Sequence, residues 1–474
     1  MQKPFDSWSW LILLMGDRNN SEGSDVSTDA GLDVICVDMD AFFASVEVRD
    51  DPSLHSEPVI VCGRGRRSVV ASCNYEARLY GVSSAMPTEQ AKRLCPNGRF
   101  LTARFPVYQR ASRDLHAILY RFTPLVEGVA LDEAYLDVSG AHLLFGSSLQ
   151  IANDIREAVR EEMGLPCSVG VGRSKLIAKL ASEEAKPKIL DSMIQPGKGV
   201  VAVPQLSEWS FLSGLDVSKL PGVGPVTSTK LRSLGVFKVE DLLNVPLSVL
   251  SRHLGITMAH RLVDLARGHD LRKVTPTRER KSIGKEITFD RDLQDMIKLR
   301  QLLFDLAVQV GDIMQRKGKA ARSISIKVRF ANFVTLTRSR SEQFPLHSSS
   351  AIARLATALF DQVDPVMPVR LVGVSVSGLV SREEQYYQQA LALDSASDGI
   401  DYQANAPKTD VGCQWTIEHP WEVMRPKRDS WSLDDRLVLA METVRERFGQ
   451  QAILSCGLAL QSMSSISSGK ELDR

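Results

Sequence analysis

The hydrophobic pattern of this chain contains two short apolar runs that carry acidic residues. The first run ends at Asp38 and Asp40. The second, in residues 129–139, surrounds Asp132 and Glu133. Each run predicts a buried strand that delivers carboxylates to its end. Because buried, unpaired carboxylates are costly, such acids indicate a hard divalent cation such as Mg²⁺. Helix caps or solvated turns are the alternative.

Runs of strand length alternate with helical spacing through the first 190 residues. Tyr75 and Arg78 are three positions apart and share a face of a short predicted helix. Arg78 could grip a phosphate with its planar fork, or it could serve as a surface ion-pair partner. The alternation predicts an α+β sheet domain with helices on one face. Strands are predicted over 58–62, 68–73 and 167–172, and helices over 41–49, 74–81, 107–122, 147–163 and 174–184.

Residues 220–225, LPGVGP, form a glycine-rich turn before a helical stretch over 226–234. This order predicts a helix–hairpin–helix. Gly222 and Gly224 would allow close approach, and backbone N–H groups at the next helix start could cradle a phosphate. With Lys230 nearby, DNA backbone binding is favoured over a simple tight turn between core helices.

Residues 282–379 show a regular order of strand, helix, strand, strand, helix and strand. In the second strand, Ile324 and Ile326 alternate with polar residues, so one face should lie in a core and the other in solvent. The solvent face is basic, which suits contact with a phosphate backbone. The candidate DNA contacts of this region are Lys327, Arg329, Arg338 and Arg340.

Composition adds a local charge imbalance that the net charge of +1 conceals. Residues 271–340 hold 17 Lys or Arg against 7 Asp or Glu. An excess of this size predicts a polyanion partner, and a solvated surface is the alternative. At 474 residues the chain is too long for one core, so several domains are expected.

The seven cysteines form no CxxC pair and no zinc spacing, which favours a reducing, cytoplasmic environment. The apolar run over 8–15 is too short to span a membrane, so no membrane association is expected. Residues 1–30 are interpreted as a mostly disordered extension, and a start site placed too early is the alternative.

Five motifs in order resemble the Y family of translesion DNA polymerases, of the bacterial DNA polymerase IV (DinB) type. They are VDMDAFFASVE, VVASCNYEARLYGVSSAMP, LDEAYLD, SVGVGRSKLIAKLASEEAKP and LPGVGPVTSTKLRSLGV. The resemblance covers about residues 32–379. It implies a right-hand polymerase with a palm, small fingers, a helical thumb and a little-finger domain.

The resemblance also implies domain boundaries. The palm would comprise residues 31–44 and 95–190, with the fingers inserted at 45–94. The thumb would occupy 191–270, a basic linker 271–281 and the little finger 282–381. Residues 382–474 form a tail to which no fold is assigned.

By resemblance, the acids would hold two Mg²⁺ ions that clamp the attacking 3′-oxygen and the leaving pyrophosphate. The metal ligands would be Asp38, Asp132, Glu133 and the backbone carbonyl of Met39. Asp40 and Asp137 are expected to be structural.

The resemblance also assigns substrate contacts. Tyr75, Arg78 and Lys186 would hold the incoming triphosphate. Phe43 would be the steric gate, an aromatic ring that clashes with a ribose 2′-hydroxyl.

Two features depart from the family pattern. Ala130 stands where Ser is common before the LDE motif, at a position that supplies no ligand. In the tail, residues 388–393 resemble a weak sliding-clamp peptide through Gln388, Leu391 and Leu393, without the usual terminal Phe. A chance match is the alternative.

The resulting hypothesis is a low-fidelity, distributive DNA polymerase that copies damaged templates. We expect a cytoplasmic monomer whose partners are primer–template DNA, dNTPs and a sliding clamp. A catalytically silent adaptor of the same family is disfavoured by the intact acids. A nucleotide cyclase would not need the helix–hairpin–helix or the basic domain, and a structural DNA-binding protein would not need clustered carboxylates.

Overall fold

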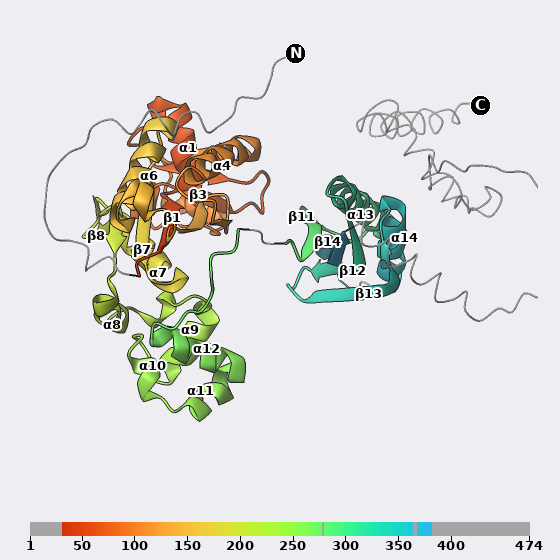
Figure 1. Cartoon of the computed structure of the whole chain (residues 1–474). Coiled ribbons are helices and arrows are strands. Elements are labelled where there is room, and N and C mark those ends of the chain that lie inside the picture. The colour runs from red at the N-terminus through yellow and green to blue at the C-terminus, as the bar shows by residue number, and fades with distance from the viewer. Residues whose placement is uncertain (1–30, 277–278, 364–366, 382–474) are drawn as a thin grey trace, which may run out of the picture. The chain divides into compact units, whose positions relative to one another are not determined.

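The computed structural model describes residues 31–276, 279–363 and 367–381 (Figure 1). The chain divides into two compact units between Arg278 and Glu279, and each is described by itself. In the described residues, no helix combines the length and apolar character needed to cross a membrane.

The first unit is built on a five-stranded sheet with β1 in the middle. β1 pairs antiparallel with β6 on one side and with β7 on the other, and β10 continues the sheet parallel to β7. The sheet order is β10 (Val200–Ala202), β7 (Cys167–Gly172), β1 (Val34–Met39), β6 (Glu133–Asp137) and β5 (Val126–Gly128).

Helices cover both faces of this sheet, so the expectation of helices on one face is wrong. α4 (Phe105–Leu119) and α6 (Ser148–Met163) share a core with Ile35 and Val37. Cys36 points the other way and packs with Ala178 of α7 (Lys175–Ala185). The reason is that β1 is apolar at both even and odd positions, so it is buried on both sides.

Two glycines in β7 set how closely α7 approaches the sheet. A Cβ at Gly170 would lie 2.0 Å from the carbonyl oxygen of Ala178, and one at Gly172 would lie 2.5 Å from Ile177. Their neighbours Val169 and Val171 enter the core on the opposite face. Because glycine and valine alternate, one face of β7 fills the core with valine side chains and the other face allows the α7 backbone to approach closely.

A smaller three-stranded sheet follows β1 and α1 (Phe42–Asp50), with a core of its own. Its strands confirm those predicted from the sequence over 58–62 and 68–73. The sheet order is β3 (Val70–Cys73), β2 (Val59–Cys62) and β4 (Arg99–Thr102), and its helices are α2 (Tyr75–Leu79) and α3 (Thr88–Leu94).

A helical cluster completes the first unit and packs on α7 through Leu176 and Leu180. Gly222 has φ 99°, a left-handed conformation that permits the tight turn before α9. The helices are α8 (Glu208–Ser213), α9 (Pro225–Ser233), α10 (Asp241–Asn244), α11 (Leu247–Leu254) and α12 (Ile256–Ala266). The hairpin β8 (Lys188–Leu190) and β9 (Met193–Gln195) and the short α5 (His142–Phe145) lie elsewhere in the unit.

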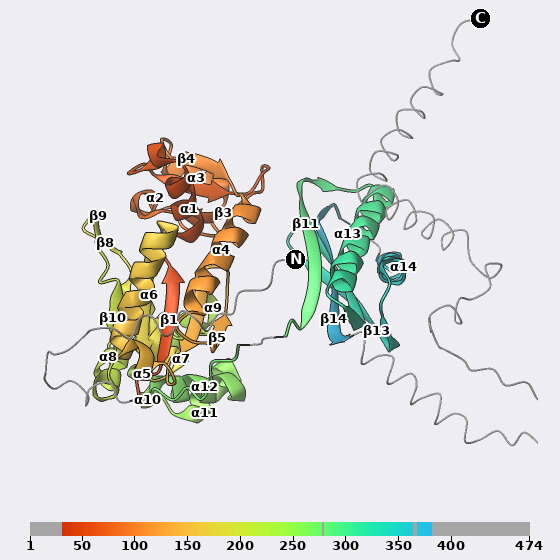
Figure 2. The same cartoon turned by 45° about the horizontal axis from the view of Figure 1, so that its top comes forward.

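The second unit is a four-stranded antiparallel sheet whose core is shared with two helices (Figure 2). The predicted order of strand, helix, strand, strand, helix and strand is confirmed. The elements are β11 (Ser282–Leu293), α13 (Met296–Arg316), β12 (Lys319–Phe330), β13 (Thr335–Leu346), α14 (Ser349–Phe360) and β14 (Val369–Ser381), with sheet order β11-β14-β12-β13.

Candidate active site

The predicted acids meet at one edge of the five-stranded sheet. Asp38 lies near the end of β1, directly opposite Glu133 at the start of β6. The backbone N–H of Met39 donates to the carbonyl of Asp132 at 3.0 Å. Asp132 and Glu133 therefore stand at the beginning of their strand and not at its end as expected. The antiparallel pairing nevertheless places them beside Asp38.

A pocket of about 160 Å³ opens beside these acids, between β1 and the small sheet. It brings together seven residues that the sequence singled out and adds others that it did not. The former are Asp38, Met39, Phe43, Tyr75, Arg78, Asp132 and Lys186, and the latter include Ala71, Ser72 and Ser84. Glu133 does not line the pocket and joins the group through a lysine.

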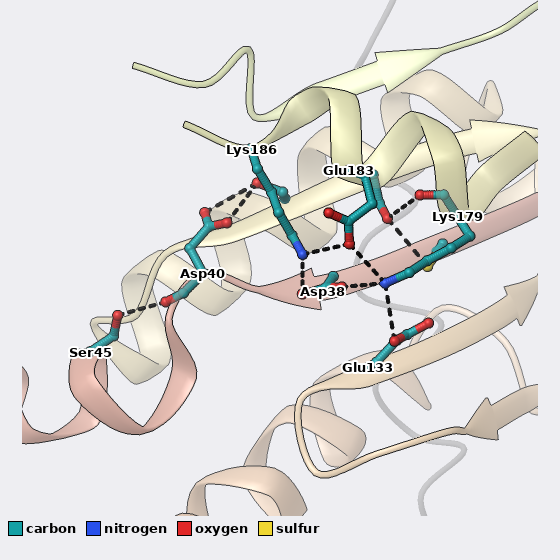
Figure 3. Close-up of polar contacts among 10 residues, drawn as sticks. Asp38, Asp40, Ser45, Glu133, Lys179, Glu183 and Lys186 are labelled. Carbon is teal, nitrogen blue, oxygen red and sulfur yellow. Dashed lines mark hydrogen bonds and ion pairs between the residues drawn. The ribbon is translucent and has the colours of Figure 1, made fainter. Parts of the chain in front are cut away.

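Two lysines of α7 and the turn after it neutralise the acids (Figure 3). Lys179 Nζ lies 2.6 Å from Asp38 Oδ2 and 3.1 Å from Glu133 Oε2. Lys186 Nζ lies 3.0 Å from Asp38 Oδ1. Glu183 contacts both lysines, at 3.1 Å from Lys179 and 2.8 Å from Lys186. Lys179 and Glu183 were not predicted as site residues from the sequence, although their helical spacing places them on one face of α7.

The charges of this cluster shift the ionisation of its members. Burial and then the charge of Asp38 raise the pKa of Asp132. Burial is the largest single effect and opposes the charged form of Lys179, but Asp38 and the other neighbouring acidic groups together outweigh it and raise the pKa of the ammonium. Lys186 behaves likewise, with its pKa raised by Asp38 and Glu183 against the effect of burial. Both lysines are therefore fixed cations, while Asp132 is an acid in need of a positive neighbour.

Asp40 takes no part in this cluster. Its carboxylate accepts from Ser168 Oγ at 2.9 and 3.1 Å, and its carbonyl accepts from Ser45 Oγ at 2.6 Å. Burial raises its pKa to about 6, an effect that the Ser168 hydrogen bond opposes. The next residue, Ala41, has φ 47°, a left-handed turn from β1 into α1. These contacts favour the structural role expected for Asp40.

The donor chemistry of the cluster fits a hard cation. The three carboxylates offer oxygen donors, and a cationic nitrogen already lies between Asp38 and Glu133. Within the described ranges, no three His, Cys, Asp or Glu side chains are arranged as a ready metal site. Lys179 and Lys186 engage both oxygens of Asp38 instead.

Phe43 is held by a cluster of aromatic rings. It stacks on Tyr108 with a centroid separation of 4.2 Å and an interplanar angle of 11°, and Phe105 meets it edge-on at 5.9 Å. The Tyr108 hydroxyl donates to Glu47, which Arg104 also binds at 2.7 Å. The Phe43 ring that lines the pocket is therefore held in place by Tyr108 and Phe105. The motif around Phe43 does not contain these two residues, so the sequence did not reveal this support.

Tyr75 and Arg78 lie on α2 as a pair, as their spacing predicted. The Arg78 guanidinium lies 4.5 Å from the centre of the Tyr75 ring, and its Nε donates to the carbonyl of Cys73 at 3.2 Å. Burial raises the pKa of Tyr75, so its hydroxyl stays protonated and can donate a hydrogen bond. Together they present one cation and one neutral donor to the pocket.

The helix–hairpin–helix candidates lie where the sequence placed them. Gly224 precedes α9 and no side chain caps that helix. Lys230 lies in the last turn of α9 and contacts the carbonyl of His253 at 3.4 Å. The N–H groups at the start of α9 can thus receive a phosphate, while Lys230 lies at the opposite end of the helix.

The structure divides the four basic candidates of the second unit between two faces of its sheet. Lys327 is paired with Thr337, and Arg329 donates to Thr335 at 2.8 Å, on the side away from the core. Arg338 and Arg340 are paired with Ile326 and Ile324. Because directly paired residues share a face, these two arginines lie on the side of the core, exposed on edge strand β13. The four do not form one surface.

The predicted clamp residues Gln388, Leu391 and Leu393 lie outside the described residues.

Comparisons with known proteins cover most of the chain. Three family models match it, namely the impB/mucB/samB family over residues 37–183, the DNA polymerase-iota thumb domain over 218–270, and the impB/mucB/samB C-terminal domain over 280–391. DNA polymerase IV of Halorhodospira halophila is 42% identical over 354 residues, which span 74% of this chain and 96% of the relative. DNA polymerase IV of Alkalilimnicola ehrlichii is 43% identical over 350 residues, or 73% of this chain and 95% of the relative.

Solved structures agree with these relatives. A chimeric Y-family DNA polymerase matches with a TM-score of 0.66 and 26% identity, covering 73% of this chain and 99% of its own. The insertion ternary complex of Dbh DNA polymerase matches with a TM-score of 0.54, 26% identity and the same coverage. This chain belongs to the Y family of DNA polymerases, of the DNA polymerase IV type, and is a DNA-directed DNA polymerase of translesion synthesis.

Proposed function

We propose that the pocket beside Asp38 is the site at which this polymerase adds a dNTP to a primer 3′-hydroxyl. The observation that carries the proposal is the convergence in one pocket of Asp38 and Asp132 with Tyr75, Arg78 and Lys186. Acids and cations gathered in one pocket suit a substrate whose triphosphate must be bound while its α-phosphorus is attacked.

The acids are the proposed metal ligands. Asp38, Asp132 and Glu133, with the carbonyl of Met39, would hold two Mg²⁺ ions. Bound there, such ions polarise the 3′-hydroxyl and neutralise charge on the leaving pyrophosphate. The chain's contribution is position, because β1 and β6 fix the carboxylates through paired backbone atoms.

Tyr75, Arg78 and Lys186 are the proposed triphosphate grip. Arg78 and Lys186 supply positive charge, and the protonated Tyr75 hydroxyl donates a hydrogen bond. Little covalent chemistry falls to these side chains, so their role is to orient the phosphates and stabilise charge as it develops.

Phe43 is the proposed steric gate. Its ring lines the same pocket as the acids and is fixed by the stack on Tyr108. A fixed ring rejects a ribose 2′-hydroxyl by repulsion, whereas a mobile ring would yield to it.

The remaining roles are proposed at the level of domains. The first unit would supply the palm (31–44 and 95–190), the fingers (45–94) and the thumb (191–270), and the second unit the little finger. Gly222 and Gly224 would meet the DNA backbone, and the basic residues of β12 and β13 would do so in the second unit. A clamp peptide at residues 388–393, a monomeric state and a cytoplasmic location remain predictions from the sequence.

Primer extension on undamaged and lesion-containing templates tests the proposed site. Alanine at both Asp132 and Glu133 should lower the extension rate by roughly 10³-fold or more, because the transition-state charge loses its compensation. Primer–template affinity should change little. Glu162→Ala is a matched control, since Glu162 is an exposed acid paired with Arg121. Extension near the parent rate in the double variant would refute the assignment.

A further inference from the structure

Lys179 makes a contact that the proposed reaction does not require. Its ammonium bridges Asp38 and Glu133, the two acids that arrive from β1 and β6 (Figure 3). The side chain is 22% exposed and Asp38 is 9% exposed, so solvent screens the bridge only in part. Unlike Lys186, Lys179 does not line the substrate pocket. Its partners are the proposed metal ligands themselves.

An ammonium and a divalent cation compete for the same carboxylate oxygens. Asp38 gives one oxygen to Lys179 and the other to Lys186. A metal ion that takes Asp38 Oδ2 or Glu133 Oε2 competes with the bridging nitrogen for that oxygen. The bridge therefore stabilises the acids before metal binds, and its free energy is subtracted from the apparent metal affinity.

Glu183 offers the displaced ammonium another partner. It lies 3.1 Å from Lys179 Nζ and one helical turn along α7. Lys186 and then Lys179 lower the pKa of Glu183 against the effect of burial, so it stays a carboxylate. Lys179 can leave the acids without becoming an unpaired, partly buried charge, which would be costly.

We propose that Lys179 is a positioning residue that holds Asp38 and Glu133 together as a built-in counter-cation and moves onto Glu183 when a metal ion takes these acids. The inference rests on the proposed metal site. It makes Lys179 a determinant of metal affinity, separate from any contact with the nucleotide.

Mn²⁺ binding to the full chain, followed through the EPR signal of the free ion, tests the proposal without measuring turnover. Lys179→Met removes the competitor, and we expect Mn²⁺ to bind roughly tenfold more tightly. Lys179→Gln serves as a second variant that also removes the charge. Lys188→Met is the matched control, because Lys188 forms its ion pair with Glu184, at a distance of 2.6 Å, and not with the acids of the site.

Thermal unfolding with and without metal distinguishes the proposed role from that of a merely structural lysine. The Lys179 variants should unfold at lower temperature in EDTA, because Glu133 then loses its ion pair with Lys179 of α7. Saturating Mn²⁺ should then raise Tm by more than it does in the parent. A structural lysine would lower Tm equally in both conditions.

The outcomes separate this inference from the metal-site proposal. Equal or weaker Mn²⁺ binding in both Lys179 variants would overturn the competition. If the parent and Asp132→Ala bind Mn²⁺ equally, the proposed metal site itself has failed, and the role of Lys179 falls with it.

Glu183→Gln tests the proposed movement. It should weaken Mn²⁺ binding in the parent because Lys179 then has no second partner. In a Lys179→Met background the same change should cost much less, since no ammonium needs to move. Equal losses in the two backgrounds would mean that Glu183 acts only through its charge, and would overturn the movement.

Discussion

The acid pocket of the first unit and the open sheet of the second both carry dense charge, but they compensate it differently. Asp38 is buried, and both of its oxygens are paired with lysines that belong to one network. On β12, Lys327 is about one-third exposed and pairs with the half-exposed Glu286 at 2.9 Å. The pocket binds its charges in fixed positions, whereas the sheet leaves them near water.

This difference indicates two kinds of function. A fixed, partly dehydrated cluster concentrates its effect on a few atoms, so a change to one contact should be felt strongly. Exposed cations contribute separately and modestly, because solvent and salt screen each one. Chemistry on one phosphorus needs the first arrangement, and a sequence-independent grip on a phosphate backbone needs the second.

The largest effect is expected where the pocket depends on backbone packing. Gly170→Ala would place a methyl group 2.0 Å from the carbonyl oxygen of Ala178 and 2.2 Å from the amide nitrogen of Ser182. Helix α7 must then move from the sheet, and Lys179 moves with it. We expect a loss of about 3 kcal/mol in the free energy of unfolding, measured by urea titration, and a matching loss of primer extension.

Gly140→Ala is the control for this change, because a Cβ at Gly140 meets nothing within 4 Å. It should leave both measurements close to the parent. A Gly170→Ala protein with parent stability and activity would show that the close contact between α7 and β7 is not needed to position the acids.

A smaller effect, confined to selectivity, is expected at the gate. Phe43→Ala removes the ring that lines the pocket and should raise ribonucleotide over deoxyribonucleotide incorporation at least ~10-fold. Single-nucleotide insertion with each sugar measures the ratio. Phe105→Ala removes a ring that touches Phe43 without lining the pocket, and should change the ratio much less. A ratio unchanged in Phe43→Ala would place the gate elsewhere.

The periodicity of the sequence predicted most elements of both regions, because strands and helices with one or two clearly apolar faces leave a strong pattern. It could not place α7 on the second face of the sheet. The sequence features on that face are two glycines in β7 and a small cysteine in β1. They indicate that some element packs closely there, but they do not indicate which element it is. Lys179 was missed because its partner Asp38 lies 141 positions away in the chain.

The faces of β13 were beyond prediction for another reason. Arg338 and Arg340 alternate with Thr337 and Ser339, so both sets of positions are polar and no hydrophobic period marks the inner side. The register of β13 on β12 assigns the faces, and that register contains an irregularity between Ala321 and Ser323. Tertiary pairing, and not local pattern, therefore separates these arginines from Lys327.

The smallest effect is expected on the open face, and it sharpens the comparison most directly. Lys327→Ala should weaken primer–template binding only about threefold and reduce the slope of log affinity against log salt by roughly 1, because one phosphate contact releases about one counterion. Fluorescence anisotropy over a salt series measures both quantities. Arg300→Ala is the matched control, since Arg300 lies on α13 and pairs with Asp361.

A drop in affinity that does not depend on salt would mean that Lys327 supports the sheet through Glu286 and does not touch the DNA backbone. A large, salt-independent loss would give this face the fixed character that the acid pocket has, and the distinction between the two regions would fail.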